Sequence, residues 1–199
     1  MAISYPLALP TVGGIRAVEF RMVNAVAYSQ SPFTFAGQAH AYQGQMWQAD
    51  ITVAPMNDDI EAGAWLGFLG ALRGQFGTFL LGYPGRASLL GTATSCTVTG
   101  VAGDNTVSAV VPSGQTLLAG DFIQLGSGSG ATLHKVLVNF TGTGSAADLE
   151  IWPALRTTRS AASATLSNAK GAFRLANNDP GWSEDIASYG ITFAAREAI

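Results

Sequence analysis

The sequence predicts a mainly β fold with one main α-helix: a β-sandwich-like sheet packed by the helix, with a small inserted β-barrel or sandwich. Three observations predict it. Apolar and polar residues alternate near both ends of the chain, and one apolar helix with a clear start signal follows the second alternating run. Between this helix and the C-terminal alternating run, residues 87–170 consist of short Ser/Thr/Gly/Val-rich runs separated by turn signals.

The N-terminal part of the chain is expected to form strands. Residues 15–26 alternate as a half-buried strand does, and the polar stretch 28–32 is interpreted as a turn. Residues 33–43 are interpreted as a broken extended pair, and residues 43–45 (QGQ) as a further turn. Residues 46–55 (MWQADITVAP) alternate again and predict a second clear strand.

Residues 59–73 predict the main helix. Asp58 is the expected N-cap, and Glu61 completes a capping box that satisfies two free backbone amides. Gly74 stands where a left-handed terminating residue is favoured. Arg73 lies in the last turn, where a cation interacts well with the helix dipole, and it is the candidate subunit-interface residue. The predicted structural core of the helix is one apolar stripe: Trp65, Phe68, Leu69 and Leu72.

The composition and residue pattern of the sequence change after Arg86, and the earlier pattern returns near Gly171. Residues 87–170 show only short strand signals at the spacing typical of a small barrel or sandwich. The alternation of residues 189–196 matches that of the N-terminal strands. The sequence therefore predicts a β domain made of residues 1–86 plus 171–199, with a peripheral β domain, 87–170, inserted into it.

Charge is unusually scarce. Only 12% of the residues are charged, against about 25% in ordinary soluble domains, and the net charge is −3. Because the centres of protein interfaces are depleted in charge, the composition favours assembly with partners. The ten Lys and Arg residues are scattered, so the chain is not expected to grip nucleic acid. No signal peptide is expected, because residues 1–10 (MAISYPLALP) have no basic segment ahead of their apolar residues. No membrane span is expected, because Arg73, Gln75 and several glycines interrupt the most apolar stretch.

No catalytic, cofactor or metal site is predicted. The candidate nucleophile is Cys96, with His134 or His40 as base, but no third group that would orient the base is apparent. One cysteine and two distant histidines do not form a tetrahedral zinc site. Residues 126–131 (GSGSGA) fit a dinucleotide-binding pattern, but no helix signal follows them, so a hairpin loop is expected.

Five motifs in order resemble one family. They are W-x-A-D-I-T-V-x-P at 47–55, A-W-L-G-F-L-x-x-L-R-G-x-x-G-T-F at 64–79, A-G-D-F-I-Q-L at 119–125, L-H-K-V at 133–136 and I-W-P-A-L-R at 151–156. Together with the inserted domain, they resemble the distal tail proteins of long, flexible-tailed bacteriophages. The motifs are structural rather than catalytic, and the resemblance spans residues 15–175.

The resemblance implies a structural virion protein at the tail tip, assembled in the host cytoplasm. It implies a homo-oligomeric ring, a hexamer in that family, which joins the tail-tube protein to the hub and fibre proteins of the baseplate. DNA would only pass through the channel of the ring, and no enzymatic activity or membrane insertion is implied.

Three alternatives remain open at this point. The first is a tail-tube or tube-terminator subunit. The second is a carbohydrate-binding module, whose aromatic platform would need Phe122, Phe140 and Trp152. The third is a peptidase or amidase that uses Cys96.

Overall fold

The computed structural model describes residues 3–185 and 188–199, and in them it shows a mainly β fold with one α-helix. The predicted fold class is confirmed. The elements are β1 (Ile15–Gln30), β2 (Gly37–Val53), α1 (Asp59–Leu72), β3 (Phe79–Gly82), β4 (Thr97–Gly100), β5 (Thr106–Val110), β6 (Thr116–Leu117), β7 (Phe122–Leu125), the short 3-10 helix η1 (Gly128–Gly130), β8 (Thr132–Val136), β9 (Phe140–Thr141), β10 (Ala147–Trp152), β11 (Arg159–Thr165), β12 (Lys170–Leu175), β13 (Trp182–Asp185) and β14 (Ser188–Glu197).

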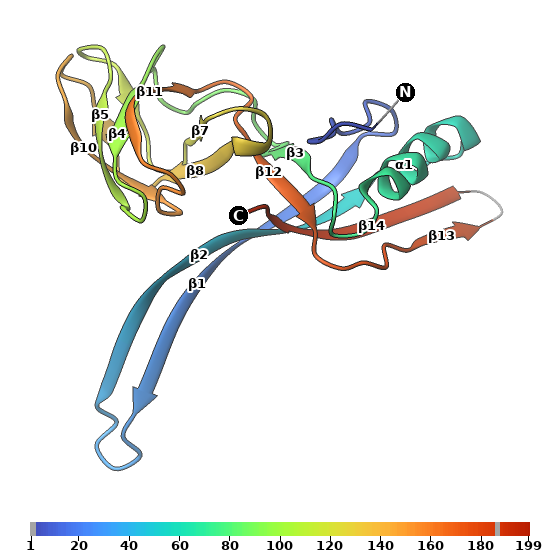
Figure 1. Cartoon of the computed structure of the whole chain (residues 1–199), viewed down its shortest axis with the longest axis horizontal. Helices are drawn as coiled ribbons and strands as arrows, with labels where there is room; N and C mark the ends of the chain where they lie inside the picture. The colour runs from blue at the N-terminus through green and yellow to red at the C-terminus, as the bar shows by residue number, and fades with distance from the viewer. Residues whose placement is uncertain (1–2, 186–187) are drawn as a thin grey trace.

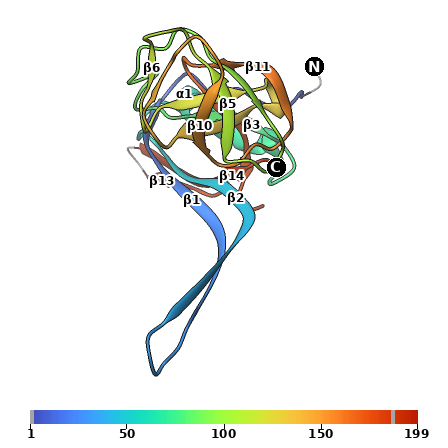
Figure 2. The ribbon, with the colours of Figure 1, turned by 90° about the vertical axis from the view of Figure 1, so that its left-hand side faces the viewer.

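One antiparallel sheet joins the two ends of the chain. Its strand order is β1-β2-β14-β12-β3. A sixth strand, β13, also pairs with β14 but lies outside this order. The long strands β1 and β2 form a hairpin whose base, near Ile15 and Val53, belongs to the sheet. Its far part leads away from the rest of the molecule as a two-stranded ribbon (Figures 1 and 2).

The N-cap of α1 follows the sequence prediction, but the predicted capping-box bond of Glu61 is not among the hydrogen bonds of the described residues, and the end of the helix differs by one residue. Asp58 is the N-cap, and its carboxylate accepts a hydrogen bond of 2.7 Å from the amide of Ile60. The helix ends at Leu72, and Arg73 is its C-cap in the left-handed conformation, with φ at 51°. The prediction that Arg73 lies in the last turn is therefore wrong, because the left-handed turn begins one residue before Gly74.

The helix packs across one face of the sheet through aromatic side chains. Trp65 and Phe68 of α1 meet edge to face, with ring centroids 5.9 Å apart. Phe68 also meets Phe79 of β3 edge to face at 5.5 Å, and Phe193 of β14 lies against both Phe68 and Trp65. This arrangement removes the largest apolar side chains of the helix from water, which stabilises the sheet and the helix together.

A second core fills a closed barrel. The barrel strands follow the order β10-β5-β4-β11-β7-β8, and β6 and β9 form a separate two-stranded sheet. In Figure 2 the molecule is turned so that the barrel faces the viewer. The fully buried residues inside include Val98, Ala109, Ile123, Leu125, Val136 and Ile151.

The chain leaves and re-enters the large sheet at one place. β3 and β12 are neighbours, with Gly82 opposite Lys170 and Leu81 opposite Gly171. All six barrel strands lie between these two positions in the sequence. That residues 87–170 form a separate domain, able to fold without the large sheet, stays a prediction. Three residues of that segment, Leu133, Trp152 and Ala169, belong to the core of the large sheet.

The hairpin differs from the sequence interpretation. Residues 28–30 and 43–45 were expected in turns, but they lie within β1 and β2, and the true turn is at residues 31–36. Strand pairing continues from Gln30 opposite Gly37 back to Ile15 opposite Val53, with two register shifts. The polar and glycine residues that resemble turns belong to a ribbon with water on both faces.

Candidate functional site: an uncharged hairpin arm

The most unusual surface is the far part of the β1–β2 hairpin, residues 24–44, called the arm below. Every residue of the arm is exposed except Ser31, which is half-buried. An isolated two-stranded hairpin is marginally stable in water, and a folded domain rarely extends one without covering it. The arm is therefore the first place to look for a partner.

The arm carries no formal charge. No Lys, Arg, Asp or Glu occurs between Arg21 and Asp50. These two residues form a salt bridge of 2.7 Å at the base of the arm, and Glu19 lies beside Arg21 at 3.0 Å. Soluble proteins commonly protect exposed strand edges with charges, and here that protection stops where the arm begins.

The two faces of the arm differ in polarity. Tyr28 stands opposite Ala39, and Val26 opposite Ala41, so one face is apolar. The other face carries His40, whose ring meets that of Tyr42 edge to face at 4.7 Å. An uncharged ribbon with one apolar face suits contact with another protein surface better than lasting exposure to water.

Both edges of the arm are free to pair. β14 pairs with β2 only along residues 48–52, and no strand in the described ranges pairs with the outer edge of β1. The backbone N–H and C=O groups along these edges can therefore accept a strand from another chain.

The barrel braces the base of the arm. The side chain of Gln45 exchanges two hydrogen bonds with Asn105, at 3.1 and 3.3 Å, and accepts a third from the amide of Ala154 at 2.7 Å. The indole N–H of Trp152 donates to Asn24 at 2.7 Å. The indole N–H of Trp47 donates to the carbonyl of Leu133 at 2.8 Å in the same contact region between β2 and the barrel, called the seam below. These contacts fix the direction in which the arm leaves the body.

A buried ion pair closes the same seam. Arg156 donates to Glu197 through Nε at 3.0 Å and through Nη2 at 2.6 Å, and Nη2 also reaches the carbonyl of Gln45 at 2.6 Å. Glu197 also accepts the backbone amide of Trp47 at 3.1 Å. The carboxylate is nearly fully buried, and its hydrogen bonds offset part of the desolvation cost.

The predicted helix residues lie together, but away from the arm. Trp65, Phe68, Leu69 and Leu72 are all buried in the core of the large sheet. Arg73 is exposed as the C-cap of α1, and α1 lies over the large sheet, away from the arm (Figure 1). Its role at a subunit interface stays a prediction.

Cys96 and His134 do not pair. The Sγ atom of Cys96 is buried and lies 3.9 Å from the carbonyl of its neighbour Thr97. The ring of His134 uses both nitrogens elsewhere: Nδ1 lies 2.7 Å from the carbonyl of Pro153, and Nε2 lies 2.9 Å from the hydroxyl of Thr132. His40, the other candidate base, lies on the exposed arm against Tyr42, whereas Cys96 lies in the barrel core. The hypothesis of a Cys96 peptidase therefore has no geometric support. Residues 3–185 and 188–199 contain no group of three metal-ligating side chains.

We expect Cys96 to react slowly in the folded protein. Burial raises the pKa of its thiol to about 11, which leaves about 100-fold less thiolate than an ordinary cysteine has near neutral pH. A thiol-reactive dye should therefore label native protein about 100-fold more slowly than protein unfolded in guanidinium. Equal labelling rates would mean that Cys96 is accessible and ionised.

We expect His134 to make stability depend on pH. Burial lowers the pKa of His134 to about 4, whereas the unfolded chain binds the proton near pH 6.5. Neutral His134 therefore contributes its full share to the free energy of unfolding above pH 6.5. This contribution is lost as the pH falls toward 4, by about 1.4 kcal/mol per pH unit, or about 3 kcal/mol in all. Urea unfolding of wild type and His134→Gln across this range should show a shallower pH slope for the variant. Identical slopes would contradict this account.

The arm was missed by sequence reasoning, although one signal marks it. The absence of charge from residue 22 to residue 49 coincides with the arm and its base. The charge content of the whole chain averages this segment with the charged residues on either side of it. The second feature, the seam between β2 and the barrel, joins residues far apart in the sequence and leaves no local pattern.

Comparisons with known proteins assign no family. No protein-family model matches the chain, and no curated protein matches it significantly. No helix in the described ranges is long and apolar enough to cross a bilayer. The resemblance to distal tail proteins therefore stays a prediction.

Proposed function

We propose that this chain is a structural subunit that assembles with copies of itself into a ring at the tip of a bacteriophage tail. There the ring would join the tail tube to the hub and receptor-binding apparatus. The observation that carries the proposal is the arm: an exposed, uncharged two-stranded ribbon with an apolar face and two unpaired edges. Such a surface fits assembly, and no catalytic constellation competes with it among the described residues.

The tail-tip placement rests on the sequence resemblance and on the closed barrel. A tail-tube or tube-terminator subunit would use the same arm, and it is the second candidate. The barrel favours the tail tip, because it is a large addition beyond what ring closure needs and it offers a peripheral surface for hub or fibre proteins. In the proposed virion, DNA passes through the channel and makes no specific contact with this chain.

The aromatic side chains that the carbohydrate-binding alternative requires are not exposed. Phe140 and Trp152 are buried, and Phe122 is partly buried against Trp47 and Tyr83. No aromatic side chain of residues 87–170 is among the exposed large apolar residues. Sugar stacking needs an exposed aromatic face, so the described residues of the barrel do not support the sugar-binding alternative, and we propose a spacer or docking role for the barrel.

The structure suggests a clean way to remove the arm. Asn24 and Gln45 stand directly opposite each other, so residues 25–44 can be replaced by the two-residue turn Asn-Gly. Sedimentation velocity of wild type, this armless variant and the control Ile60→Ala should show concentration-dependent assembly in wild type and control only. If the armless variant folds and assembles as wild type does, the arm is not the assembly surface and the proposal fails.

A further inference from the structure

The tip of the arm presents two phenylalanines to solvent. Phe33 is 91% exposed and Phe35 is 74% exposed, although large aromatic side chains usually gain most from burial. Phe35 has a φ of 55°, a left-handed conformation that is rare and costly for a bulky residue. A strained backbone that holds two aromatic rings in water indicates a site built for a partner.

The tip is held rigidly. The amide of Phe35 donates to the carbonyl of Ser31 at 3.0 Å, and the amide of Ser31 donates to the carbonyl of Ala36 at 2.9 Å. The side-chain amide of Gln30 donates to the carbonyl of Phe35 at 2.9 Å. The ring of Tyr28 lies directly over Gly37, where a Cβ would collide with the phenolic oxygen. The loop is therefore organised before any partner binds, which lowers the entropy cost of docking.

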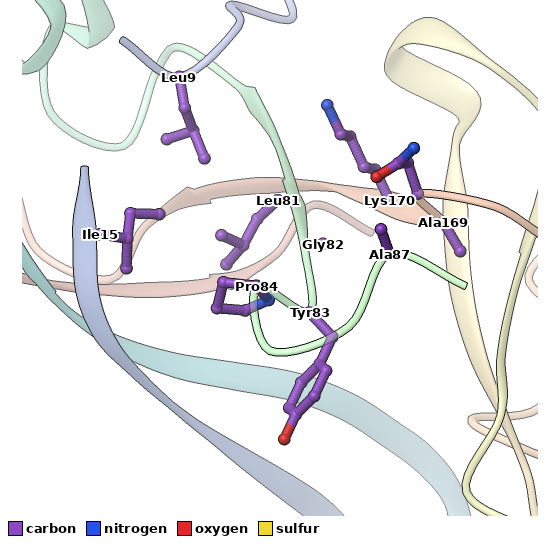
Figure 3. A pocket seen from close by; sticks show the side chains of 10 residues that line it. Leu9, Ile15, Leu81, Gly82, Tyr83, Pro84, Ala87, Ala169 and Lys170 are labelled. Atoms are coloured by element: carbon purple, nitrogen blue, oxygen red, sulfur yellow. The ribbon is translucent and has the colours of Figure 1, made fainter. Parts of the chain in front are cut away.

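The body of the same chain contains an apolar pocket of about 190 Å³. In Figure 3, the side chains of Leu9, Ile15, Leu81 and Pro84 converge on one space. Lys170 is the only charged residue among the ten that line it. An apolar cavity of about 150 Å³ is enough to bind benzene, so this pocket has room for one phenyl ring.

The pocket wall is also fixed in advance. The ring of Tyr83 stacks on Phe122 with centroids 5.3 Å apart. The following segment is anchored by Asp121, a fully buried carboxylate that accepts the amides of Leu90 and Gly91 and lies 3.5 Å from Arg86. A pocket that keeps its shape when empty is suited to receive a side chain without rearrangement.

We propose that the arm tip of one subunit docks in this pocket of a second copy, with Phe33 or Phe35 as the inserted ring. The inference deepens the proposed ring function and rests on it. Pocket and tip match in size, in apolar character and in the absence of acidic groups. The pocket is wide enough for one ring, so the second phenylalanine would pack at its rim beside Lys170, where a cation–π contact is favourable.

The tip and the pocket of one chain cannot meet. Ile15, in the pocket wall, and Gln30, next to the tip, are the two ends of β1, about 50 Å apart at the usual strand rise. A compact chain of this length is about 40 Å across. The arm therefore reaches just past its own body to the next subunit, and the contact is head-to-tail, which closes into a ring when the rotation allows it.

Two variants separate the two halves of this contact. The tip variant combines Phe33→Ser and Phe35→Ser, and the pocket variant is Ala87→Trp, which fills the pocket from its exposed rim. The matched controls are Phe76→Ser, which removes a ring that is 72% exposed elsewhere, and Ala102→Trp in an exposed turn. Ala87→Phe is used instead if Ala87→Trp does not unfold cooperatively.

Native mass spectrometry of the variants, alone and mixed, tests the docking. Each variant alone should need about 30-fold or more protein to assemble, as expected for loss of an interface hot spot, while both controls match wild type. An equal mixture should give dimers only, because one intact tip and one intact pocket remain.

Any of three results would overturn the docking. If wild type forms rings and both variants do so equally well, the docking is wrong while the ring proposal stands. If wild type stays monomeric throughout, both fail. Cosedimentation of wild type with phosphatidylglycerol vesicles, lost in the tip variant while its assembly is normal, would assign the tip to a membrane and overturn the docking.

Discussion

Replacing Trp65 by alanine is expected to lower the free energy of unfolding by about 3–5 kcal/mol, a large part of the roughly 5–15 kcal/mol that stabilises a typical domain. The side chain is fully buried between α1 and the sheet, and its indole N–H donates to the carbonyl of Val12 at 2.8 Å. The substitution leaves a large cavity and an unpaired carbonyl. Soluble, folded protein should be lost or strongly reduced.

The control for Trp65 lies on the same helix. Ile60 is 80% exposed on the outer side of the first turn, so Ile60→Ala should change stability little. Urea unfolding followed by circular dichroism measures both variants. A loss below about 1 kcal/mol for Trp65→Ala would show that the helix does not seal the core as described.

Arg156→Met should cost about 3–5 kcal/mol, although Arg156 is partly accessible at the protein surface. The substitution leaves Glu197 buried with the amide of Trp47 as its remaining donor in the described contacts. The double variant Arg156→Met/Glu197→Gln removes both charges and should recover part of the loss, because the cost comes from the unpaired carboxylate.

The control for the buried pair is the exposed one. Arg21 pairs with Glu19 and Asp50 in water, so Arg21→Met should leave the unfolding midpoint nearly unchanged. Chemical denaturation of all four proteins decides the matter. Equal midpoints for Arg156→Met and Arg21→Met would contradict the role given to the seam between the barrel and β2.

The main helix could be predicted from sequence because its signals are local. Asp58 caps it, and the spacing of Trp65, Phe68 and Leu72 produces one buried stripe. Its end was placed one residue late: Gly74 is left-handed as predicted, with φ at 65°, but Arg73 already takes that conformation, with φ at 51°. Helix ends depend on a single backbone conformation, which composition predicts less well than an apolar stripe.

Two strands show why the β structure was harder to predict. The arm has no buried face, so it lacks the alternation that marks a strand, and its Gly44 and neighbouring glutamines resemble a turn. β11 has little strand signal of its own. Its sequence is rich in Ala and Ser, and the left-handed Ala161 at φ 45° accompanies a shift in its pairing with β4. Neighbouring strands fix β11 in place, and local propensity does not.

The candidate site combines both kinds of information. The scarcity of charge predicted assembly from composition alone. Where that surface lies depends on long-range contacts, since Gln45 meets Asn105 and Arg156 meets Glu197 only in the folded chain. A single sequence contains no local signal for such pairs.

Negative-stain imaging of the purified wild-type protein, over a range of concentrations, tests the central claim most directly. The account predicts closed rings of uniform diameter with a central hole, and their loss when residues 25–44 are replaced by Asn-Gly. Compact single particles of the wild-type protein at every concentration, or rings that persist in the armless variant, would contradict it.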